Sequence, residues 1–473
     1  MSKQQNLIII LSDEHQARAM GCVGHPFVKT PHLDKLAARS TLYSNAYTPS
    51  PICVPARAAF ATGRYAHQIS TWDNAMPYTG DPKGWGHALQ DAGVRVESIG
   101  KLHYRKDDDP TGFDKLHLPM QVAGGTGMVW ASFRKLDERF SHGKRMLGDY
   151  IGPGESPYTQ YDTRITDLTV DWLQQAAEQE QPWCLYVGLV APHFPLICPQ
   201  EFYNLYPEGS LPEPKLHPTT GYQRHPWVEL QNALMDSEAN FTDEAERQRA
   251  FSAYYGLCSW LDSNVGEIMQ TLEATGLADN TTVIYSSDHG DNVGARGLWG
   301  KSNMYEEAAA VPMLVARPGQ TAEVTTTPVS LVDIAATVLD HFNLPEDPAY
   351  VGNSLYQLPA HDQNRVVYSE YHAVGAVTGA FMVRQGDWKL IHYHDFEPEL
   401  FNLNTDSEEL TNLSADPAYA DMLQHMYAIL AEICDTKQVE WQAHEDQDAM
   451  IEAYGGREVA ITLGAPAATP APK

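Results

Sequence analysis

The chain has 473 residues, 43% hydrophobic and 10% aromatic, so it can bury a large core with room for a second, smaller domain. Its 32 Lys and Arg residues against 61 Asp and Glu residues give a formal net charge of -29 at pH 7. This charge argues against nucleic acid, an anionic membrane surface or a long polyanion as the main partner, whereas a small or cationic ester is easier to reconcile with it. Solubility alone would explain the acidity equally well.

The cysteines and the apolar runs of the sequence indicate the cellular compartment. Six cysteines are spread too widely for a small disulfide scaffold, and no Cys-x-x-Cys pair indicates zinc. The apolar run 7–11 near the N-terminus is too short for a signal peptide, and no run approaches the about 18 apolar residues of a membrane span. We therefore expect a cytoplasmic protein without a membrane partner.

The first predicted element is a strand over residues 6–11, a continuous apolar run that is typical of a buried parallel strand. Asp13 and Glu14 follow it, at the end of the strand where open α/β sheets bind their ligands. Asp13 alone could cap a helix, but two adjacent carboxylates after a buried strand favour a metal site. A short helix is expected next, with Pro31 at its first position.

Residues 53–64, Cys-Val-Pro-Ala-Arg-Ala-Ala-Phe-Ala-Thr-Gly-Arg, are predicted to start a helix after a proline-rich loop. Arg57 lies four residues after Cys53, so both side chains share one face of the first turn. An anion held there would meet a nucleophile, backbone N–H groups and a fixed cation. An isolated pair of this kind is more often a buried structural cysteine, and the other candidate residues along the chain reverse that preference.

Two further predicted strands end in basic or imidazole side chains. Residues 94–100 lead to Lys101 and His103, which strand alternation places on one side and which suit an anion site, although a surface role is the commoner explanation. Residues 183–191 form the next buried strand, and His193 follows it between two prolines.

A strand predicted over residues 281–286 ends in adjacent Asp288 and His289. Both side chains can reach one point only where the backbone turns, and Gly290 permits such a turn. This pair suits a divalent cation, and Lys301 follows a short distance on. Several candidate residues thus gather at the strand ends along one edge of the predicted sheet, a pattern that chance rarely produces: Asp13, Lys101, His103, His193, Asp288 and His289.

The remaining elements complete the predicted architecture. Residues 105–160 and 199–245 lack periodicity and are expected to be long insertions, the second of them shaping access to the site. Longer helices are expected over 164–179, 244–273 and 330–342, and one more strand over 311–316.

Beyond about residue 360, four short strands and one helix over 419–433 predict a small antiparallel sheet with one packing helix. The expected fold class is therefore α/β, with a large mixed, mostly parallel sheet flanked by helices over residues 1–360. A smaller α+β domain is expected over 361–460, followed by a disordered Ala/Pro-rich tail over 461–473.

Together these motifs resemble a type I, formylglycine-dependent sulfatase of the alkaline phosphatase superfamily. The resemblance covers nearly the whole chain, including the segments Gly386-Asp-Trp-Lys-Leu and Glu399-Leu-Phe-Asn-Leu of the C-terminal domain. It rests on these motifs: Asp13 after the first strand, Cys53-x-Pro55-x-Arg57 with Thr62-Gly63-Arg64, Lys101-x-His103, His193, Asp288-His289-Gly290 and Lys301.

The resemblance implies an alkaline phosphatase-like fold and hydrolysis of a sulfuric ester. It implies that a maturation enzyme oxidises Cys53 to formylglycine (3-oxoalanine), whose hydrate attacks sulfur with one hydroxyl and releases sulfate with the other. A divalent cation is implied, expected to be Ca²⁺, with Mn²⁺ or Mg²⁺ also compatible. The implied roles are metal binding by Asp13, Cys53, Asp288 and His289, sulfate binding by Arg57, Lys101 and Lys301, assistance to the leaving group by His193, and proton removal by His103.

The sequence also departs from the common sulfatase pattern. Many sulfatases have two aspartates where this chain has Asp13 and Glu14, so Glu14 is a metal ligand, a neighbour of the ligands or neither. His289 in place of asparagine resembles choline-sulfatases and phosphonate monoester hydrolases, and the segment Asp73-Asn74-Ala75 resembles the choline-sulfatase group. Asn74 is therefore a candidate substrate-binding residue.

Hydrolysis of a small organic sulfate ester is the expected function. A phosphonate monoester or phosphodiester hydrolase using the same site stays open, as does an inactive anion- or metal-binding homologue. A homo-oligomer is possible. The leaving group stays unidentified, because aromatic residues that could hold a quaternary ammonium or a sugar face could equally be core: Trp72, Tyr104, Trp130, Tyr158 and Tyr161.

Overall fold

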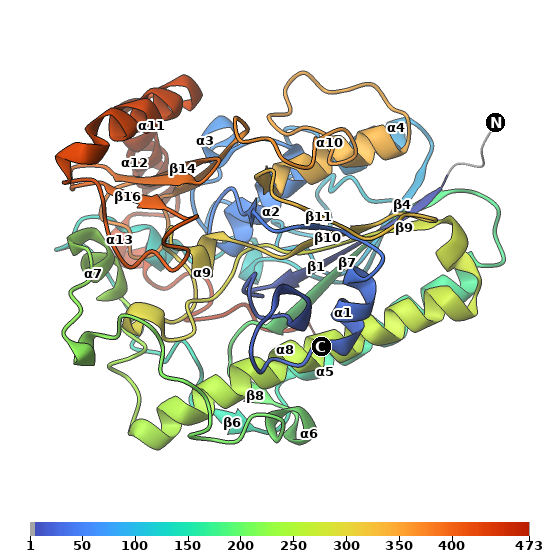
Figure 1. The fold of residues 1–473 in the computed structure, drawn as a ribbon, viewed down its shortest axis with the longest axis horizontal. Coiled ribbons are helices and arrows are strands. Elements are labelled where there is room, and N and C mark those ends of the chain that lie inside the picture. The colour runs from blue at the N-terminus through green and yellow to red at the C-terminus, as the bar shows by residue number, and fades with distance from the viewer. Residues whose placement is uncertain (1–4, 473) are drawn as a thin grey trace.

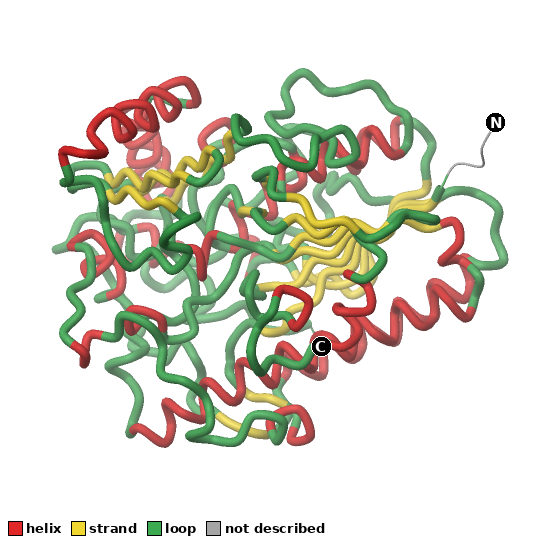
Figure 2. Tube along the Cα trace, viewed as in Figure 1, coloured by secondary structure: helices red, strands yellow, loops and turns green. Residues whose placement is uncertain are grey.

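The structure, a computed structural model, describes residues 5–472. At its centre lies an eight-stranded sheet, drawn as arrows in Figure 1 and as the twisted yellow layer in Figure 2. Its strands are β1 (Asn6–Asp13), β2 (Thr41–Tyr43), β4 (Arg95–Lys101), β5 (Lys115–Met120), β7 (Trp183–Pro192), β9 (Thr281–Ser287), β10 (Met313–Ala316) and β11 (Glu323–Thr325). Their order in the sheet is β11-β2-β10-β9-β1-β7-β4-β5.

Most strand pairs in this sheet are parallel. β1 pairs in parallel with β7 and β9, and β4 pairs in parallel with β7 and β5. β10 runs antiparallel to both β9 and β2, so the sheet is mixed as predicted. Because the four central strands β1, β4, β7 and β9 run the same way, their carboxyl ends meet at one edge of the sheet.

Helices cover both faces of the sheet (Figure 1). Along β1, Ile8 and Ile10 pack with α1 (Pro31–Ala37), α5 (Pro157–Ala176) and α8 (Glu244–Ala274). Leu7 and Ile9 point to the opposite face, where they pack with α2 (Cys53–Thr62), α4 (Trp85–Asp91) and α10 (Val332–His341). This alternation explains why β1 is apolar at every position from 7 to 11, since a strand buried on both faces has no polar side.

The long helix α5 begins earlier than the predicted 164. Ser156 accepts a hydrogen bond from the backbone N–H of Thr159, and Pro157 occupies the first helical position. This cap starts the helix about two turns ahead of its clearest apolar periodicity. α8 is capped in the same way by Asp243, and its observed bounds agree closely with the predicted helix.

The C-terminal part contains the predicted antiparallel sheet, in the order β13 (Val366–Tyr371), β14 (Ala380–Gln385), β15 (Trp388–Tyr393) and β16 (Glu399–Asn402). α11 (Ala420–Ile433) packs against β14 and β15, as expected for one covering helix. A second helix, α12 (Thr436–Ala453), was missed because most of its side chains are polar and only a narrow stripe, including Val439 and Ala443, joins the core.

The two segments predicted to be insertions contain more structure than expected. Within 105–160, β5 is an edge strand of the main sheet, and its mostly half-buried side chains give little alternation. The other short elements are β3 (Ala46–Tyr47), α3 (Ala66–Ile69), β6 (Gly152–Pro153), β8 (Ile197–Cys198), α6 (Gln200–Tyr203), α7 (Pro226–Asn232), α9 (Glu306–Ala309), β12 (Val329–Ser330) and α13 (Arg457–Ala460).

The end of the chain differs from the predicted disordered tail, because residues 465–472 pack against the body of the protein. Trp130 donates a hydrogen bond from Nε1 to the backbone oxygen of Ala465 at 2.8 Å, and Tyr158 donates one to the backbone oxygen of Thr469. Ala and Pro side chains offer few atoms for packing, so these contacts use backbone groups that composition does not reveal. The proposed boundaries at 360 and 460 stay predictions.

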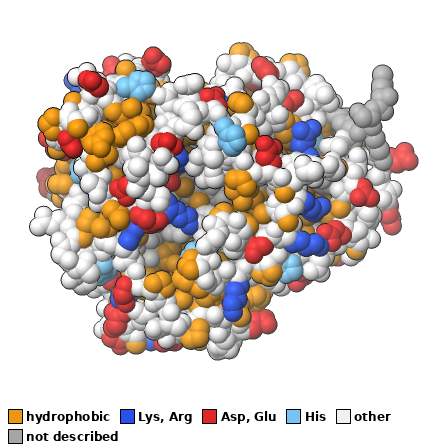
Figure 3. Space-filling model, viewed as in Figure 1, with side chains coloured by type: hydrophobic (Ala, Val, Ile, Leu, Met, Phe, Trp, Pro, Cys, Tyr) orange, Lys and Arg blue, Asp and Glu red, His pale blue; other side chains and the backbone are white. Residues whose placement is uncertain are grey.

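Charged side chains are dispersed over the visible surface. Figure 3 shows acidic and basic side chains interspersed on one face, without a continuous basic stripe for a nucleic acid backbone. Among the helices within residues 5–472, none combines the length and the apolar character needed to cross a membrane.

Candidate active site

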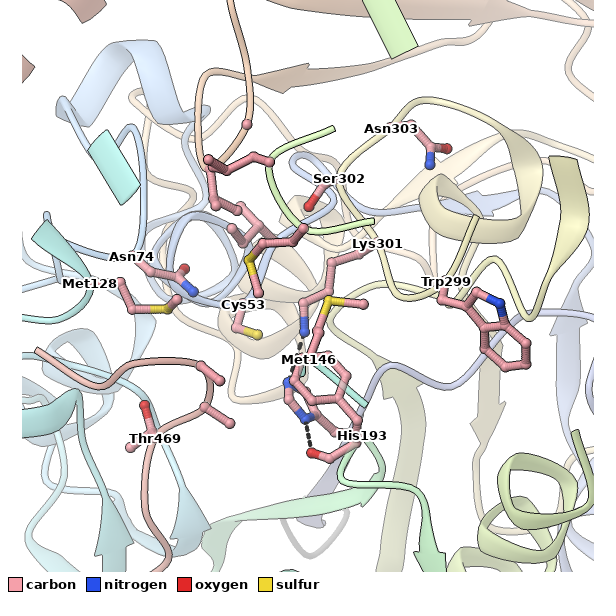
Figure 4. A pocket seen from close by; sticks show the side chains of 18 of the residues that line it. Cys53, Asn74, Met128, Met146, His193, Trp299, Lys301, Ser302, Asn303 and Thr469 are labelled. Atoms are coloured by element: carbon pink, nitrogen blue, oxygen red, sulfur yellow. Dashed lines mark hydrogen bonds between the residues drawn. The ribbon is translucent and has the colours of Figure 1, made fainter. Parts of the chain in front are cut away.

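The candidate active site lies where the carboxyl ends of β1, β4, β7 and β9 meet the first turn of α2. Figure 4 shows a cavity here, with Cys53, Lys301 and His193 grouped near its centre. Cys53, Lys101, His103, His193, Lys301 and the candidate substrate contact Asn74 all line it. Asp13, Asp288 and His289 lie directly behind Cys53 and are fully buried.

Cys53 is the first residue of α2, and its side chain is almost completely buried. No side chain caps the helix from Ile52, but Oδ1 of Asn74 accepts a hydrogen bond from the backbone N–H of Val54 at 3.1 Å. Burial, reinforced by the nearby Asp13 carboxylate, raises the pKa of the Cys53 thiol to about 11. An unmodified thiol here is therefore protonated at neutral pH and is a poor nucleophile.

Arg57 is placed differently from the sulfate-binding role implied by the resemblance. Its Nε donates to Asp288 Oδ2 at 2.8 Å, and its Nη2 donates to Asp13 Oδ2 at 3.0 Å. Its Nη1 donates to the hydroxyl of Tyr186 and to the backbone oxygen of Lys101. Arg57 is not among the residues that line the cavity, and in this structure its guanidinium holds two carboxylates in position.

The carboxylate of Asp13 is the electrostatic centre of the site. Lys101 Nζ lies 2.6 Å from Asp13 Oδ2. Burial alone would raise the pKa of Asp13, but Lys101, then His193, Arg57 and Lys301, outweigh it and hold that pKa well below its usual value. Asp13 is therefore ionised and available to a cation across the whole physiological pH range.

Four side chains could hold a metal ion together. Ligand atoms of Asp13, Cys53, Asp288 and His289 all lie within 4.8 Å of one another. His289 Nδ1 contacts the backbone oxygen of Gly290 at 3.1 Å, which assigns the proton to Nδ1 and leaves Nε2 as a free lone pair. That Nε2 lies 3.3 Å from Cys53 Sγ and 3.6 Å from Asp288 Oδ1, so the donors converge as a divalent cation requires.

Glu14 is fully buried beside this group, in a left-handed backbone conformation at φ 69°. Its Oε2 lies 3.2 Å from Lys301 Nζ, and the Asp291 carboxyl is a further close neighbour. Burial raises the pKa of Glu14 well above its usual value, and the charge of Lys301 lowers it only in part. Two adjacent buried carboxyls need a shared proton or a cation, so this corner also fits a metal ion.

His193 and Lys301 form a pair facing the cavity (Figure 4). His193 Nδ1 donates to the backbone oxygen of Phe194, so its Nε2 accepts from Lys301 Nζ at 2.8 Å. Burial, together with the charge of Lys301, lowers the pKa of His193 well below its usual value. Burial also lowers the pKa of Lys301, but the thiol of Cys53 and the carboxyl of Glu14 outweigh this and raise it overall. The imidazole is therefore neutral beside a charged ammonium.

His103 lines the cavity on its other side. Its Nε2 lies 2.8 Å from the hydroxyl of Thr469 in the C-terminal tail, and its Nδ1 has no hydrogen-bond partner among the described residues. Burial and then the charge of Lys101 lower the pKa of His103 well below its usual value. The predicted alternation does not place these two residues, because β4 ends at Lys101 and the backbone reverses at His103 with φ 61°.

Some residues of the site escaped prediction. Tyr186 ties Arg57 to the backbone of β4, and Asp162 accepts hydrogen bonds from the backbone N–H groups of Val190 and Ala191 at 2.8 Å, just before His193. Neither of these two residues has a local sequence signal. Asp291 does have one, because it lies three residues after Asp288 in the same predicted segment at a strand end. Of the five aromatic residues named above, Tyr158 alone is among the residues that line the described cavity.

The comparisons with known proteins agree with this geometry. Residues 5–344 match the family described as sulfatase, which is well over half of the chain. The chain belongs to the sulfatase family. Residues 294–436 also match the family described as N-sulphoglucosamine sulphohydrolase, C-terminal. The protein is therefore a sulfuric ester hydrolase, and the predicted resemblance is confirmed.

Two curated relatives align with most of this sulfatase. It is 31% identical over 425 residues to a choline-sulfatase of Rhizobium meliloti (strain 1021), covering 87% of this chain and 83% of that protein. It is 30% identical over 443 residues to arylsulfatase K of Homo sapiens, covering 87% of this chain and 79% of that protein.

Solved structures share the fold. A phosphonate monoester hydrolase of Agrobacterium radiobacter aligns with a TM-score of 0.75 at 21% identity, covering 91% of this chain and 95% of that one. A protein in complex with its substrate D-glucosamine-2-N,6-O-disulfate aligns with a TM-score of 0.72 at 23% identity, covering 95% of this chain and 99% of that one. The predicted α/β fold class, with its small antiparallel sheet, is confirmed.

Proposed function

We propose that this sulfatase hydrolyses the sulfate ester of a small organic molecule, with residue 53 as formylglycine and a divalent cation beside it. The observation that carries the proposal is the position of Cys53. Its Sγ lies 3.3 Å from His289 Nε2 and 3.8 Å from Asp13 Oδ1, while its side chain opens into the cavity that Lys101 and Lys301 line. The reacting atom thus stands between a metal site and an anion site.

The donor set fits a divalent cation, held by Asp13, Asp288, His289 and residue 53, with Glu14 at its edge. When bound, the cation lowers the pKa of a coordinated hydroxyl and neutralises charge on the ester. Carboxylate oxygens dominate the set, which supports Ca²⁺ and leaves Mn²⁺ or Mg²⁺ as alternatives.

Formylglycine supplies what the thiol lacks. Oxidation of Cys53 by a maturation enzyme, followed by hydration, provides one hydroxyl that attacks sulfur and a second that expels sulfate. One observation favours this modification over the free thiol: burial raises the pKa of Cys53 to about 11, although Lys301 and Lys101 each lower it, so the unmodified thiol stays protonated at neutral pH.

The other residues of the chain have separable roles in this proposal. Lys101 and Lys301 bind the sulfate oxygens, since both ammonium groups line the cavity while Arg57 is used behind it. His193 accepts a hydrogen bond from Lys301, so the pair can pass the ammonium proton to the oxygen of the departing alcohol. Neutral His103 lines the cavity and is placed to accept a proton when sulfate leaves.

A phosphonate monoester hydrolase is the second candidate function. A tetrahedral phosphonate ester would meet the same lysines and the same nucleophile, and the fold likeness to a phosphonate monoester hydrolase supports keeping this alternative. The low identity of that structure gives no support beyond the fold.

The two functions separate in one assay. The protein is co-expressed with a formylglycine-generating enzyme, and release of 4-nitrophenol is followed from 4-nitrophenyl sulfate and from 4-nitrophenyl phenylphosphonate. We expect the higher kcat/KM for the sulfate. A higher value for the phosphonate would establish the second candidate, and matured protein that hydrolyses neither ester would be an inactive homologue.

A further inference from the structure

The active-site cavity has two ends that differ in chemistry. We call the group Cys53, Lys101, His103, His193 and Lys301 the anion end. The mouth is the apolar part of the remaining lining, and the free volume inside the cavity is about 70 Å³. The mouth consists of Ile52, Met128, Met146, Tyr158, Phe194, Leu234, Met235, Leu298, Trp299, Val374, Ala467 and Ala468.

The described lining of the cavity contains no carboxylate. Lys101 and Lys301 are its charged side chains, and the nearest carboxylates at the anion end are already paired with them. Asp13 lies 2.6 Å from Lys101, and Glu14 lies 3.2 Å from Lys301. A cationic leaving group would enter the mouth without an anionic partner and with two ammonium groups ahead of it, which disfavours it.

The aromatic rings of the mouth do not form a cage for a cation. Lys301 Nζ lies 4.9 Å from the centroid of the Phe194 ring, so that ring already faces one positive charge. The Trp299 ring packs against Phe251 at a centroid distance of 4.9 Å, and its Nε1 donates to Glu238. The third ring of the lining, Tyr158, meets the His193 ring edge-on at a centroid distance of 5.8 Å. A quaternary ammonium needs several free aromatic faces that converge on one point, which these three engaged rings do not supply.

The mouth also offers few hydrogen bonds. Gln231 donates to the backbone oxygen of Val374, and the amide of Asn303 is used by Asn292 and Tyr305. Nδ2 of Asn232 is buried without a partner among the described residues, and Asn74 and Ser302 are further polar side chains of the lining. A sugar carries several hydroxyls that would face mainly the apolar side chains of the mouth and lose water there, so a sugar leaving group is disfavoured as well.

We propose that the leaving group of this sulfatase is an uncharged, mainly apolar alcohol or phenol bound among the methionines of the mouth. This inference rests on the proposed function and narrows its substrate class. Met128 and Met146 project into the cavity in Figure 4, and Met235 also lines it. Flexible thioether side chains adapt to differently shaped apolar groups, so several such esters should be accepted. The choice of leaving group departs from the cationic alcohol named in the choline-sulfatase relative.

A matched pair of substrates tests the inference. Choline sulfate and 3,3-dimethylbutyl sulfate have the same shape, because a carbon atom replaces the quaternary nitrogen in the second. We expect the matured enzyme to show a kcat/KM at least about tenfold higher for 3,3-dimethylbutyl sulfate, because the cation has no partner in the mouth. Equal values, or a higher value for choline sulfate, would overturn the inference while leaving the sulfatase proposal intact.

The same experiment separates the two levels of the argument. If protein with formylglycine at residue 53 hydrolyses neither of these esters nor 4-nitrophenyl sulfate, the proposed function fails and the leaving-group inference falls with it. Sulfate release from any of the three keeps the function, and the ratio of the matched pair then decides the leaving group.

A pair of variants locates the selectivity. Met235→Glu places a carboxylate in the mouth, and we expect the ratio of the two kcat/KM values to shift at least about tenfold toward choline sulfate. Leu136→Glu adds the same charge at a residue that is 58% exposed and outside the cavity, and we expect it to leave the ratio unchanged. An unchanged ratio in Met235→Glu, or equal shifts in both variants, would contradict a leaving group bound in the mouth.

Discussion

The anion end and the mouth of the active-site cavity come from different parts of the chain. Strand ends and the first turn of α2 build the anion end, where Cys53, Lys101 and Lys301 lie within a network of ion pairs and hydrogen bonds. Loops between the elements and the C-terminal tail supply much of the mouth, where Met146, Met235 and Ala468 contribute apolar surface.

In the proposed function, the anion end carries the chemistry and the mouth carries the selectivity. The groups of the anion end are fixed by partners on several elements, so that a substitution there disturbs every substrate alike. The mouth contributes contacts that depend on the leaving group, so a substitution there changes the ranking of substrates. The predictions below test this division, beginning with the largest expected effect.

Removal of the proposed nucleophile should have the largest effect. We expect Cys53→Ala to lower kcat by at least about 10³-fold for every ester, because alanine cannot supply the hydroxyl that the proposed mechanism requires. The measurement is sulfate release under conditions in which the wild-type enzyme is saturated. Cys434→Ala, in the C-terminal part of the chain, is the matched control and should retain wild-type activity. Full activity in Cys53→Ala would remove residue 53 from the chemistry.

The second-largest effect is expected at Arg57, whose guanidinium holds the carboxylates of Asp13 and Asp288 in position. We expect Arg57→Leu to lower stability by about 3–5 kcal/mol, since Asp13 and Asp288 lose a buried counter-ion, and to weaken metal affinity by about 10–100-fold. Denaturant unfolding and titration of metal-free protein with Ca²⁺ measure the two quantities. If Arg57 instead bound sulfate directly, KM for all esters would rise while metal affinity stayed unchanged.

A variant of Asp162 tests whether a residue outside the cavity positions His193. Asp162→Ala leaves the backbone N–H groups of Val190 and Ala191 without their acceptor, at about 1–3 kcal/mol for each buried donor. Because these groups precede His193, we expect kcat to fall about tenfold more for alkyl sulfates than for 4-nitrophenyl sulfate, which needs little protonation of its leaving group. An equal loss for both substrates would show that Asp162 acts on stability alone.

The pH dependence sharpens the account of the anion end. Burial and then Lys301 lower the pKa of His193 below its ordinary value of 6.5, and burial and then Lys101 do the same for His103. Both imidazoles therefore stay neutral as the pH falls through 6.5, and the acid limb of kcat/KM should lie well below that value. Lys301→Met removes one of the positive charges that lower the pKa of His193, so the acid limb of kcat/KM should move to higher pH. A wild-type limb at or above pH 6.5 would contradict this assignment.

The smallest expected effect concerns the hydrogen bond between Thr469 of the C-terminal tail and His103 of the anion end. Thr469→Val removes the hydroxyl that contacts His103 Nε2, and one hydrogen bond of about 0.5–1.5 kcal/mol corresponds to a two- to tenfold change in kcat/KM. Ala471→Gly, a tail substitution outside the cavity lining that retains this hydroxyl, serves as the comparison. The measurement is steady-state kinetics with one alkyl sulfate. Identical kcat/KM values for the two variants would show that the hydroxyl of Thr469 does not influence His103.

The sequence revealed the anion end better than it revealed the mouth. Strands with polar residues at their ends point to a shared edge, which is how Asp13, Lys101 and His193 could be grouped before the fold was known. The role of Arg57 could not be predicted, because its partners Asp288 and Tyr186 are separated from it by more than 100 residues and meet it only in the folded chain.

The sequence shows no comparable pattern for the residues of the mouth. Met146 and Met235 lie in segments without periodicity, and small tail residues such as Ala468 carry no signal for packing. The edge strand β5 and the polar helix α12 were missed for a related reason, since each buries too little apolar surface to produce a clear alternation or stripe.

The most direct test of the central claim is the mass of the tryptic peptide 40–57 from protein produced with a formylglycine-generating enzyme. This peptide contains Cys53 and ends at Arg57. The account predicts a mass about 18 Da below that of the cysteine peptide, the change expected when the thiol becomes an aldehyde, together with sulfatase activity that scales with the modified fraction. Active enzyme whose peptide carries only unmodified cysteine would contradict the proposed nucleophile.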